Sequence, residues 1–520
     1  MGILTPMRTT KQWLWELFSP GSTYIYSGPG SSSSAHSSVL TCQQSEYVSD
    51  KLPVDILHHI QSLLPLKDAA RTACISRGFL HAWRCYSNLA LDAKTLGLAR
   101  IEFDYRETFL IHIVDNILSK HSGHGLEIFR LDFRFSKNVY ASYLDRWLKI
   151  VFHSGIKELS LMMPSLKKKG YIFPCWVLSD EAAVSSVQFL DLHACAFRTT
   201  TALGCSRSLR KLHLSFVDIT DDGLGHFLSK SSALEEMDIF NCSKIICLRL
   251  PCTLQKLKFL KVTLCESLQA VDINAPKLST FHFIGTLVKF STADPSPLKN
   301  VTLASFAPSH TLSFARARLP AIAENVISLT LRSASENVNT PMLISKFPCL
   351  TKLEIDIQRS QRSFLNFDVM SLVSFLHASP TLDSFILHVG QEALRQDDLV
   401  GGGGDSANYQ RWKPQCRHDH LRQVMITGFC SDKNMIQFVI YILENSPSLE
   451  CLTLDTIPGI DRSCGIIGKM ERCSRMSENS IAEAHRAVTF ANGYIKERVP
   501  LGVRFQVLEP CIRCHIRRRC

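Results

Sequence analysis

The stretch from Asp50 to Trp83 reads DKLPVDILHHIQSLLPLKDAARTACISRGFLHAW and has the spacing of short amphipathic helices. Its apolar residues recur at steps of three and four, which places them on one stripe of a helix. These residues are Leu52, Ile56, Leu57, Ile60, Leu63 and Leu64. We expect Asp50 to cap this helix, Pro53 to lie in its first turn, and Pro65 to end it.

Two shorter helices are expected to follow. The first begins near Lys67-Asp68, and the second carries Phe79, Leu80 and Trp83. Three helices in roughly 35 residues are too few to enclose a large core by themselves. Their remaining apolar surface must therefore dock on the rest of the chain or on a partner.

This stretch resembles the F-box of plant F-box proteins. The matching residues are Leu52-Pro53, Asp55-Ile56-Leu57, Ile60, Leu63, Pro65 through Thr72, Ser76-Arg77 and Trp83. The chain departs from the plant pattern at Gly78-Phe79, where Arg-Trp is usual. The resemblance implies binding to a Skp-type adaptor and, through it, to the cullin of a ubiquitin ligase. The residues expected at that contact are Leu52, Pro53, Ile56, Leu57, Ile60, Leu63, Pro65 and Leu66, with Trp83 supporting the cluster. Some of them can pack internally on the opposite edge of the stripe.

A degenerate L-x-x-L-x-L repeat follows the F-box-like stretch. Its units begin at Ile128, Ile156, Val187, Leu209, Leu234, Leu257, Leu278, Leu298, Val326, Leu350, Leu382, Leu421 and Leu449. Spacings of mostly about 20 to 32 residues are close to those of leucine-rich repeats. Each unit is a short strand that cannot bury its inward residues alone, so neighbouring units stack. The alternative, an α/β sheet with scattered leucines, does not account for so many units in phase.

Two further features fit a leucine-rich repeat. Cys195, Cys242 and Cys265 fall on the position where a side chain bonds backbone groups in the turn after the strand. Helices are expected between strands, for example over 221–228 and 434–443. The predicted fold class is therefore α/β, with an N-terminal F-box helix cluster followed by a leucine-rich-repeat solenoid.

The C-terminal part resembles the FBD region of plant F-box proteins. The similarity is carried by residues 421–429 and 442–450, and residues 483–487 and 507–511 resemble the ends of grass members. The expected organisation is a flexible leader over 1–45, the F-box over 46–90, the solenoid over 120–410, an FBD-like region closing the solenoid over 411–460, and a C-terminal segment with a basic tail over 461–520. A loop around Gly401–Gly404 is expected to be inserted between two repeats.

The composition indicates an ordinary globular protein, with 45% hydrophobic and 20% charged residues. We expect it to be soluble and cytoplasmic or nuclear, because it has neither a secretory signal nor an apolar run long enough to cross a membrane. The 19 cysteines form no disulfide framework. The net charge of +11 is moderate, and the basic runs Lys167–Lys169 and Arg517–Arg519 are interpreted as solvated. Neither nucleic acid nor a membrane is predicted as a partner.

No catalytic motif stands out, so we predict neither an enzyme nor a cofactor. Asp221-Asp222 is better explained by a favourable interaction with a helix dipole than by a metal. The best zinc candidates are His418-x-His420 near Cys416 and Cys511-x-x-Cys514-His515 with Cys520. The second group has the right first spacing but no matching second pair nearby, and no metal site is predicted.

The family resemblance implies a substrate-recognition subunit of an SCF-type (cullin–RING) ubiquitin ligase. The target would lie against outward strand residues, and we select His213, Asp238, Phe240, Lys261 and His282. Both charge signs together with an aromatic residue favour a protein partner over a phosphate backbone. One alternative is a leucine-rich-repeat scaffold that no longer engages the ligase, and another is an enzyme whose site has no familiar motif.

Overall fold

The computed structural model describes most of the chain. The described residues are 52–98, 103–121, 125–134, 141–165, 170–178, 186–199, 207–292, 296–305, 310–334, 336, 338–358, 368–390, 416–459 and 476–511. The predicted leader, the Gly401–Gly404 loop and both basic runs lie outside these ranges. The chain divides into two compact units, Met1–Leu234 and Glu235–Cys520, and each is treated separately below.

The first unit begins with a cluster of short helices, α3 (Val54–Leu63), α4 (Leu66–Thr72) and α5 (Arg77–Arg84). Pro53 occupies the N-cap of α3, so the prediction that Asp50 caps this helix is wrong. The reason is that proline fixes φ near the helical value and needs no amide partner. The Pro53 carbonyl accepts bonds from the amides of Ile56 (3.0 Å) and Leu57 (3.3 Å).

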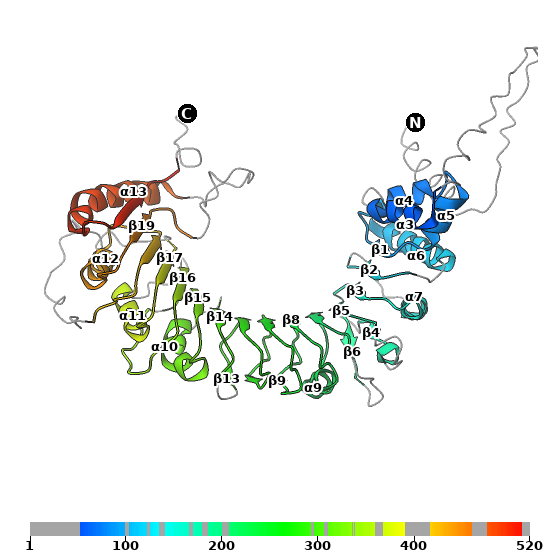
Figure 1. The fold of residues 1–520 in the computed structure, drawn as a ribbon, viewed down its shortest axis with the longest axis horizontal. Coiled ribbons are helices and arrows are strands. Elements are labelled where there is room, and N and C mark those ends of the chain that lie inside the picture. The colour runs from blue at the N-terminus through cyan, green and yellow to red at the C-terminus, as the bar shows by residue number, and fades with distance from the viewer. Residues whose placement is uncertain are drawn as a thin grey trace, which may run out of the picture. The chain divides into compact units, whose positions relative to one another are not determined.

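Helix α5 forms even though Gly78 weakens its first turn by about 1 kcal/mol relative to alanine. Ser76 is in an extended conformation at the N-cap, and its hydroxyl accepts a hydrogen bond from the Phe79 amide at 3.3 Å. Such a cap contributes about 1 kcal/mol and offsets the glycine. Figure 1 shows the cluster beside β1 at the N-terminal end of the unit.

One buried glutamine connects the helices. Gln61 of α3 is 1% exposed. Its Nε2 lies 2.8 Å from the Thr72 hydroxyl and 3.3 Å from the carbonyl oxygens of Ala69 and Phe79. A single amide thus bonds to both α4 and α5. Tyr86 donates a hydrogen bond to the Leu64 carbonyl at 2.9 Å, which ties the end of α3 to the segment before β1.

The rest of the first unit is a parallel sheet with helices between its strands. Its strands, in the order in which they pair, are β1 (Asn88–Leu91), β2 (Ile128–Asp132), β3 (Glu158–Met162), β5 (Phe189–His193) and β7 (Lys211–Ser215). The connections contain α6 (Phe103–Lys120), α7 (Ala141–His153), η2 (Cys175–Leu178), α9 (Asp221–Ser229) and the parallel pair β4 (Ile172–Phe173) and β6 (Ala196–Phe197).

The second unit continues the same strand-per-repeat pattern. Its parallel strands are β8 (Glu236–Phe240), β10 (Phe259–Thr263), β12 (Thr280–Ile284), β14 (Asn300–Ser305), β15 (Ser328–Ala334), β16 (Lys352–Gln358), β17 (Ser384–Val389), β18 (Gln423–Thr427), β19 (Cys451–Asp455) and β20 (Arg504–Leu508). A smaller sheet contains β9 (Cys247–Leu250), β11 (Ala270–Ile273) and β13 (Lys289–Thr292).

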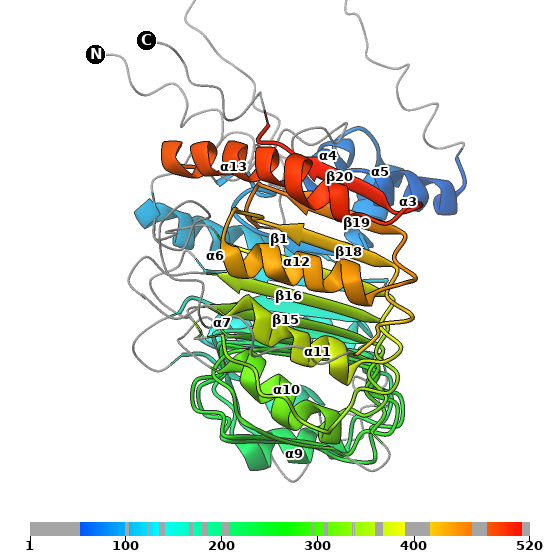
Figure 2. The ribbon, with the colours of Figure 1, turned by 90° about the vertical axis from the view of Figure 1, so that its left-hand side faces the viewer.

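Helices cover one face of the second unit. They are α10 (Thr311–Ile322), η3 (Val369–Leu372), α11 (Val373–Ala378), α12 (Lys433–Asn445) and α13 (Glu478–Phe490), followed by the short turns η6 (Ala491–Ile495) and η7 (Lys496–Arg498). Figure 2 shows α10, α11 and α12 along the strands β15 to β18. The Asp432 carboxylate caps α12 by accepting bonds from the amides of Asn434 and Met435.

Twelve of the thirteen predicted repeat units match a strand, and their apolar residues are buried. Leu260, Leu303 and Leu329, for example, have no exposed surface. The unit predicted to begin at Ile128 is two residues out of phase, and Ile128 itself is half-buried. The reason is that Phe129 and Leu131 are the register partners of Leu159 and Leu161.

The predicted helices are also confirmed, as α9 and most of α12. Asp221 and Asp222 lie in the first turn of α9, where the helix dipole favours carboxylates. The predicted α/β fold, with its helical start and leucine-rich-repeat sheet, is confirmed.

The turn after the strand has a repeated backbone geometry. Ala194, Phe216, Asn241 and Leu264 each follow a strand directly and have φ between 48° and 55°. Ala194, Asn241 and Leu264 are each followed by one of the predicted turn cysteines, which are Cys195, Cys242 and Cys265. The thiols of Cys242 and Cys265 lie 3.7 Å from the carbonyl oxygens of Phe240 and Thr263, two residues earlier, as the repeat pattern predicts.

The sheet extends beyond the boundary expected at residue 460. Strand β20 pairs with β19 in parallel, and Thr456 donates to the Leu508 carbonyl at 2.9 Å.

The backbone makes a close contact where β17 and β18 end. Gly428 has φ of +69°, and a β-carbon added there would lie 2.0 Å from the Val389 carbonyl oxygen.

Candidate functional site

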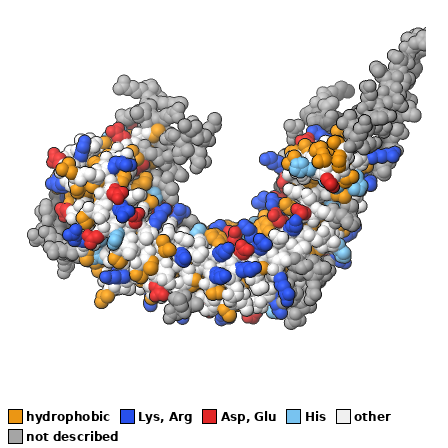
Figure 3. Space-filling view, in the orientation of Figure 1, with side chains coloured by type: hydrophobic (Ala, Val, Ile, Leu, Met, Phe, Trp, Pro, Cys, Tyr) orange, Lys and Arg blue, Asp and Glu red, His pale blue; other side chains and the backbone are white. Residues whose placement is uncertain are grey.

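Exposed apolar side chains gather on the N-terminal helices. We call this surface the apolar F-box face, and it consists of Leu52, Val54, Ile56, Leu63, Ile75 and Leu80, with Ile60 half-buried beside them. Leu63 is 71% exposed and Ile56 is 45% exposed. Figure 3 shows hydrophobic side chains concentrated over these helices at its upper right. A clustered apolar surface on one small element is typical of a protein-binding site.

The helical period separates this face from the interior of the cluster. Ile56, Ile60 and Leu63 follow one another at steps of four and three on one side of α3. Leu57 and Gln61 are four residues apart on the adjacent side and are buried against α4 and α5. One helix therefore supplies both a core and a surface stripe.

The structure divides the predicted adaptor-binding residues into three groups. Leu52, Pro53, Ile56, Leu63 and Pro65 are exposed. Ile60 and Trp83 are half-buried, and the Trp83 ring packs 5.5 Å from that of Tyr86. Leu57 (3% exposed) and Leu66 lie inside the cluster, where they hold the helices together and cannot contact a partner.

Sequence reasoning missed Val54, Ile75 and Leu80, which are all exposed. Val54 lies at the start of α3, outside the predicted stripe. Ile75 lies in the turn between α4 and α5, where a helical period carries no information. The sequence signal that could have identified Ile75 is a large apolar residue in a turn, directly before the N-capping Ser76.

Buried polar contacts attach the cluster to the first sheet. His121, just after α6, has its Nε2 3.0 Å from the Tyr86 carbonyl oxygen. Burial lowers the pKa of His121 and raises the pKa of the Tyr86 phenol. Both groups therefore stay neutral near pH 7, which suits their partly enclosed position between the helices and β1.

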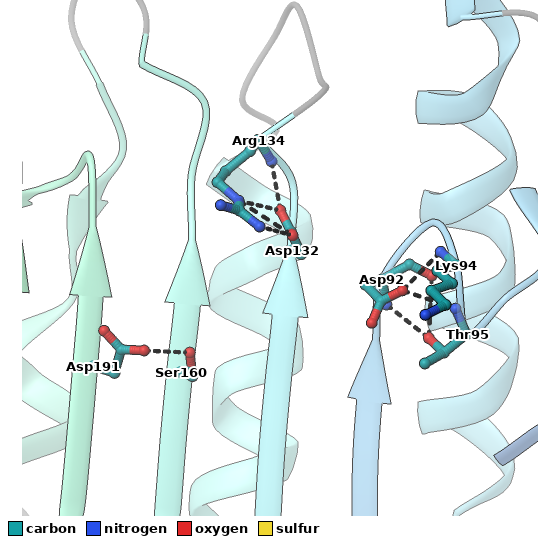
Figure 4. A network of polar contacts seen from close by, with 7 residues as sticks. All are labelled: Asp92, Lys94, Thr95, Asp132, Arg134, Ser160 and Asp191. Atoms are coloured by element: carbon teal, nitrogen blue, oxygen red, sulfur yellow. Dashed lines mark hydrogen bonds and ion pairs between the residues drawn. The ribbon is translucent and has the colours of Figure 1, made fainter. Parts of the chain in front are cut away.

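Acidic residues on and just after the strands of the first unit make polar contacts (Figure 4). Asp132, at the end of β2, pairs with Arg134 at 2.7 Å, and Ser160 of β3 donates to Asp191 of β5 at 2.8 Å. Although burial opposes it, Arg134 holds the pKa of Asp132 below its usual value. In the β1 turn, Asp92 accepts bonds from the amides of Lys94 and Thr95.

Four of the predicted target-binding residues come together in the second unit. Asp238 of β8, Lys261 of β10 and His282 of β12 are register partners on adjacent strands. Lys261 bonds to Asp238 at 3.0 Å, and Phe240 lies two residues along β8 on the same face. Burial, and then the charge of Lys261, lowers the pKa of His282.

The fifth residue, His213, lies on β7 in the first unit. Its ring meets that of Phe189 edge-on at 4.9 Å, much as His282 meets Phe259 at 5.2 Å. Each histidine therefore packs on a phenylalanine that begins the strand next to its own. All five predicted target-binding residues are half-buried.

Neither of the two zinc candidates forms a group of metal ligands among the described residues. His418 is buried, and its Nε2 lies 3.0 Å from the Tyr441 hydroxyl, whose oxygen is also 2.9 Å from Nε2 of His377. Burial lowers the pKa of His418 to about 4. Cys514, His515 and Cys520 lie outside the described residues. Within the described ranges, a different group, His58, His81 and Cys85, brings its ligand atoms within 4.8 Å of one another.

None of the helices in the described segments is long and apolar enough to cross a bilayer.

Comparisons with known proteins identify the repeats. The model of the At1g61320/AtMIF1-type LRR domain matches residues 117–512. The F-box/LRR-repeat protein At3g18150 of Arabidopsis thaliana is 25% identical over 423 residues, which cover 77% of this chain and 84% of that protein. The F-box/FBD/LRR-repeat protein At5g56810 of the same plant is 23% identical, over 82% of this chain and 94% of its own length.

Among solved structures, an internalin from Listeria monocytogenes is similar, with a TM-score of 0.29 and 14% identity over 66% of this chain and 88% of its own. The resemblance to plant F-box proteins with leucine-rich repeats and an FBD-like region is confirmed by the named plant relatives. Since the family model covers the chain from the end of α6 to β20, the protein belongs to the At1g61320/AtMIF1-type leucine-rich-repeat family.

Proposed function

We propose that this protein is the substrate-recognition subunit of an SCF-type (cullin–RING) ubiquitin ligase. The observation that carries the proposal is the apolar F-box face, which three short helices present outside their own small core. The proposed occupant is a Skp-type adaptor, and through it the cullin. The names of the plant relatives point in the same direction, because they combine an F-box with leucine-rich repeats.

In this mechanism the chain makes and breaks no covalent bond. The apolar F-box face holds the adaptor, and the strand faces hold a target protein. The target is thereby kept near the ubiquitin-loaded enzyme, so that ubiquitin transfer becomes effectively intramolecular. Proximity of this kind raises the effective concentration of the reacting groups without any catalytic side chain in this subunit. A cytoplasmic or nuclear location is part of the proposal, since the ligase acts there.

The intact third helix supports adaptor binding over the scaffold alternative. The departure from the plant pattern at Gly78-Phe79 would matter most if it prevented α5 from forming. Helix α5 nevertheless runs from Arg77 to Arg84, capped by Ser76 and held to α3 through Gln61. The supports of the apolar F-box face are therefore in place.

The decisive experiment measures binding of the full chain to a plant Skp-type adaptor. The variant Ile56→Asp/Leu63→Asp places two charges on the exposed stripe of α3 without entering the core. Burying a charge in an apolar interface is strongly unfavourable, so we expect the affinity to fall at least about a hundredfold. Leu57→Asp is unsuitable, because Leu57 is internal and its loss would unfold the cluster.

A matched control carries the same chemical change elsewhere. Ile172→Asp/Ile344→Asp alters two exposed isoleucines outside the helical cluster and should bind the adaptor like wild type. Both double variants should keep the wild-type circular dichroism and melting temperature. If wild type itself fails to bind the adaptor, the scaffold alternative replaces the proposal.

The target-binding part of the proposal concerns Asp238, Phe240, Lys261 and His282. Affinity purification from cells with the proteasome blocked measures which proteins the chain retains. We expect the variant Phe240→Ala/Lys261→Ala to recover at least about tenfold less of the proteins that wild type retains. Lys289→Ala, on β13 of the smaller sheet, is the control and should retain them. Equal retention by both variants would remove this face from the proposal.

A further inference from the structure

One group of potential metal ligands has no role in the proposed function. His58 of α3 lies opposite His81 of α5 and Cys85, the C-cap residue of α5. One ligand atom from each residue lies within 4.8 Å of the other two. The rings of His58 and His81 meet edge-on, with their centroids 6.1 Å apart.

The helical framework fixes this arrangement. His81 and Cys85 are four residues apart, which places both side chains on one face of α5. His58 precedes Gln61 by three residues on α3, and the Gln61 amide bonds to the Phe79 carbonyl of α5. This bond begins three residues from His58 and ends two residues from His81, so α3 and α5 cannot separate near the group without breaking it. The three side chains are therefore held on packed, regular elements rather than on loops.

The group is open to solvent on one side and to a cavity on the other. His81 is exposed, whereas His58 and Cys85 are half-buried. His58 and Cys85 also line an open cavity of about 530 Å³, together with His59 and Glu127. A cavity of this size holds several water molecules, so a fourth ligand to an ion has room there. The Glu127 carboxylate also pairs with Lys157 at 2.5 Å.

We propose that His58, His81 and Cys85 form a zinc site, with the fourth position open to water in the adjoining cavity. Imidazole and thiolate ligands together suit Zn²⁺, and three protein ligands with one open position make a recognised zinc arrangement. Tetrahedral bonds of about 2.0–2.3 Å place the ligand atoms roughly 3.5 Å apart. The ligand atoms lie within 4.8 Å of one another, so binding an ion requires the side chains to rotate, and His81 is exposed. On binding, the Cys85 thiol releases its proton to solvent and coordinates as thiolate.

The site lies on the other side of α3 from Ile56 and Leu63, although Val54, four residues before His58, shares the side of the proposed ligand. His58 follows Ile56 by two residues on α3, which is more than half a turn around the helix, and lies five residues before Leu63. A bound ion would join α3 to α5 while leaving Ile56 and Leu63 free for a partner. The zinc site therefore stands or falls independently of the proposed ligase role.

The test uses reduced, metal-free full-length protein and Co²⁺ as the spectroscopic probe. All samples carry Cys511→Ser and Cys514→Ser, so that the tail cysteines contribute no signal. We expect one equivalent of Co²⁺ to bind with a thiolate charge-transfer band and the visible bands of tetrahedral coordination, and Zn²⁺ to displace it. Cys85→Ser should lose the charge-transfer band, and His81→Asn should bind at least tenfold more weakly.

Matched controls come from the same region. Cys74→Ser changes an exposed cysteine of the helical cluster, and His112→Asn changes an exposed histidine of α6. Both should bind Co²⁺ as the parent protein does. Because His81 is exposed, we expect His81→Asn to fold normally. This variant therefore still tests the site if Cys85→Ser unfolds. Zn²⁺ should raise the melting temperature of the parent and of Cys74→Ser, but not of His81→Asn. Loss of the band with Cys74→Ser, or unchanged binding with His81→Asn, would overturn the site.

Discussion

Helix α3 and the repeat strands use the same apolar residue types with opposite results. On α3, Leu63 and Ile56 remain exposed, whereas Leu260 of β10 and Leu303 of β14 are fully buried. Each interior strand has a neighbour on both edges, and its inward side chains are enclosed by those of the next repeats. Helix α3 packs through one side only. Local pattern therefore creates an apolar stripe, but the number of neighbours decides whether that stripe becomes core or surface.

The largest expected effect tests this contrast directly through truncation. Leu260→Ala should lower the free energy of unfolding by about 3 kcal/mol, because it removes a fully enclosed side chain and leaves a cavity. Ile56→Ala should change it by less than about 0.5 kcal/mol, since its side chain is exposed. Urea denaturation followed by circular dichroism measures both. Similar losses for the two variants would mean that α3 is covered in solution.

A pH dependence should distinguish the repeat array from the helices. The pKa of His418 is about 4 in the folded protein and near 6.5 when unfolded, because burial disfavours the charged imidazole. The neutral form stabilises the fold above about pH 6.5, and this contribution of up to about 3 kcal/mol is lost as the pH falls through 4. Urea midpoints between pH 7 and pH 4 should therefore fall.

Two histidine variants separate this effect from general acid unfolding. His418→Gln cannot become charged, so its urea midpoint should depend less steeply on pH. His420→Gln changes an exposed histidine two residues away and should behave as wild type does. Parallel pH profiles for wild type and His418→Gln would show that His418 is not the titrating group.

The polar centre of the helical cluster should matter more than its exposed apolar residues. Gln61→Ala leaves the Ala69 and Phe79 carbonyls and the Thr72 hydroxyl without this donor. We expect a loss of about 2 kcal/mol, the usual cost of leaving buried polar groups unpaired. Amide hydrogen exchange should show the loss confined to 54–84. A wild-type exchange pattern would mean that water replaces the glutamine.

The smallest expected effect concerns the strand face. Lys261→Ala breaks the partly exposed pair with Asp238 and should cost less than about 1 kcal/mol. The difference between wild type and variant should shrink further at high salt, because ions screen such pairs. A loss above 2 kcal/mol would show that this face is a structural element and not a solvated surface.

The fold was predictable from the sequence wherever the spacing of apolar residues alone determines the local structure. The triplet Leu257, Leu260 and Val262 predicts a strand because its spacing suits only an inward-facing row. Strand β20 was missed because Gly502 stands where the L-x-x-L-x-L pattern needs its first apolar residue, although Phe505 and Val507 pair with Leu452 and Leu454. The strands of the smaller sheet were missed because four residues such as those of β9 carry too little pattern.

The candidate site was predictable in part, for a related reason. Helical period placed Ile56 and Leu57 on one stripe but could not decide which of them faces the other helices. That choice depends on the positions of α4 and α5, which sequence spacing does not contain. His58 and Cys85 are 27 positions apart in sequence, counted from their residue numbers, so no spacing rule joins them. Only the packing of α3 against α5 brings them together.

The close approach at Gly428 has a genetic consequence. Every missense change of that codon introduces a β-carbon, and no rotamer can move this atom away from the Val389 oxygen. The ends of strands β17 and β18 would have to separate, and this would weaken the pairing between β17 and β18 on which β19 and β20 continue the sheet. A screen for revertants of a Gly428 variant should therefore recover glycine itself, or compensating changes in the segment that carries Val389.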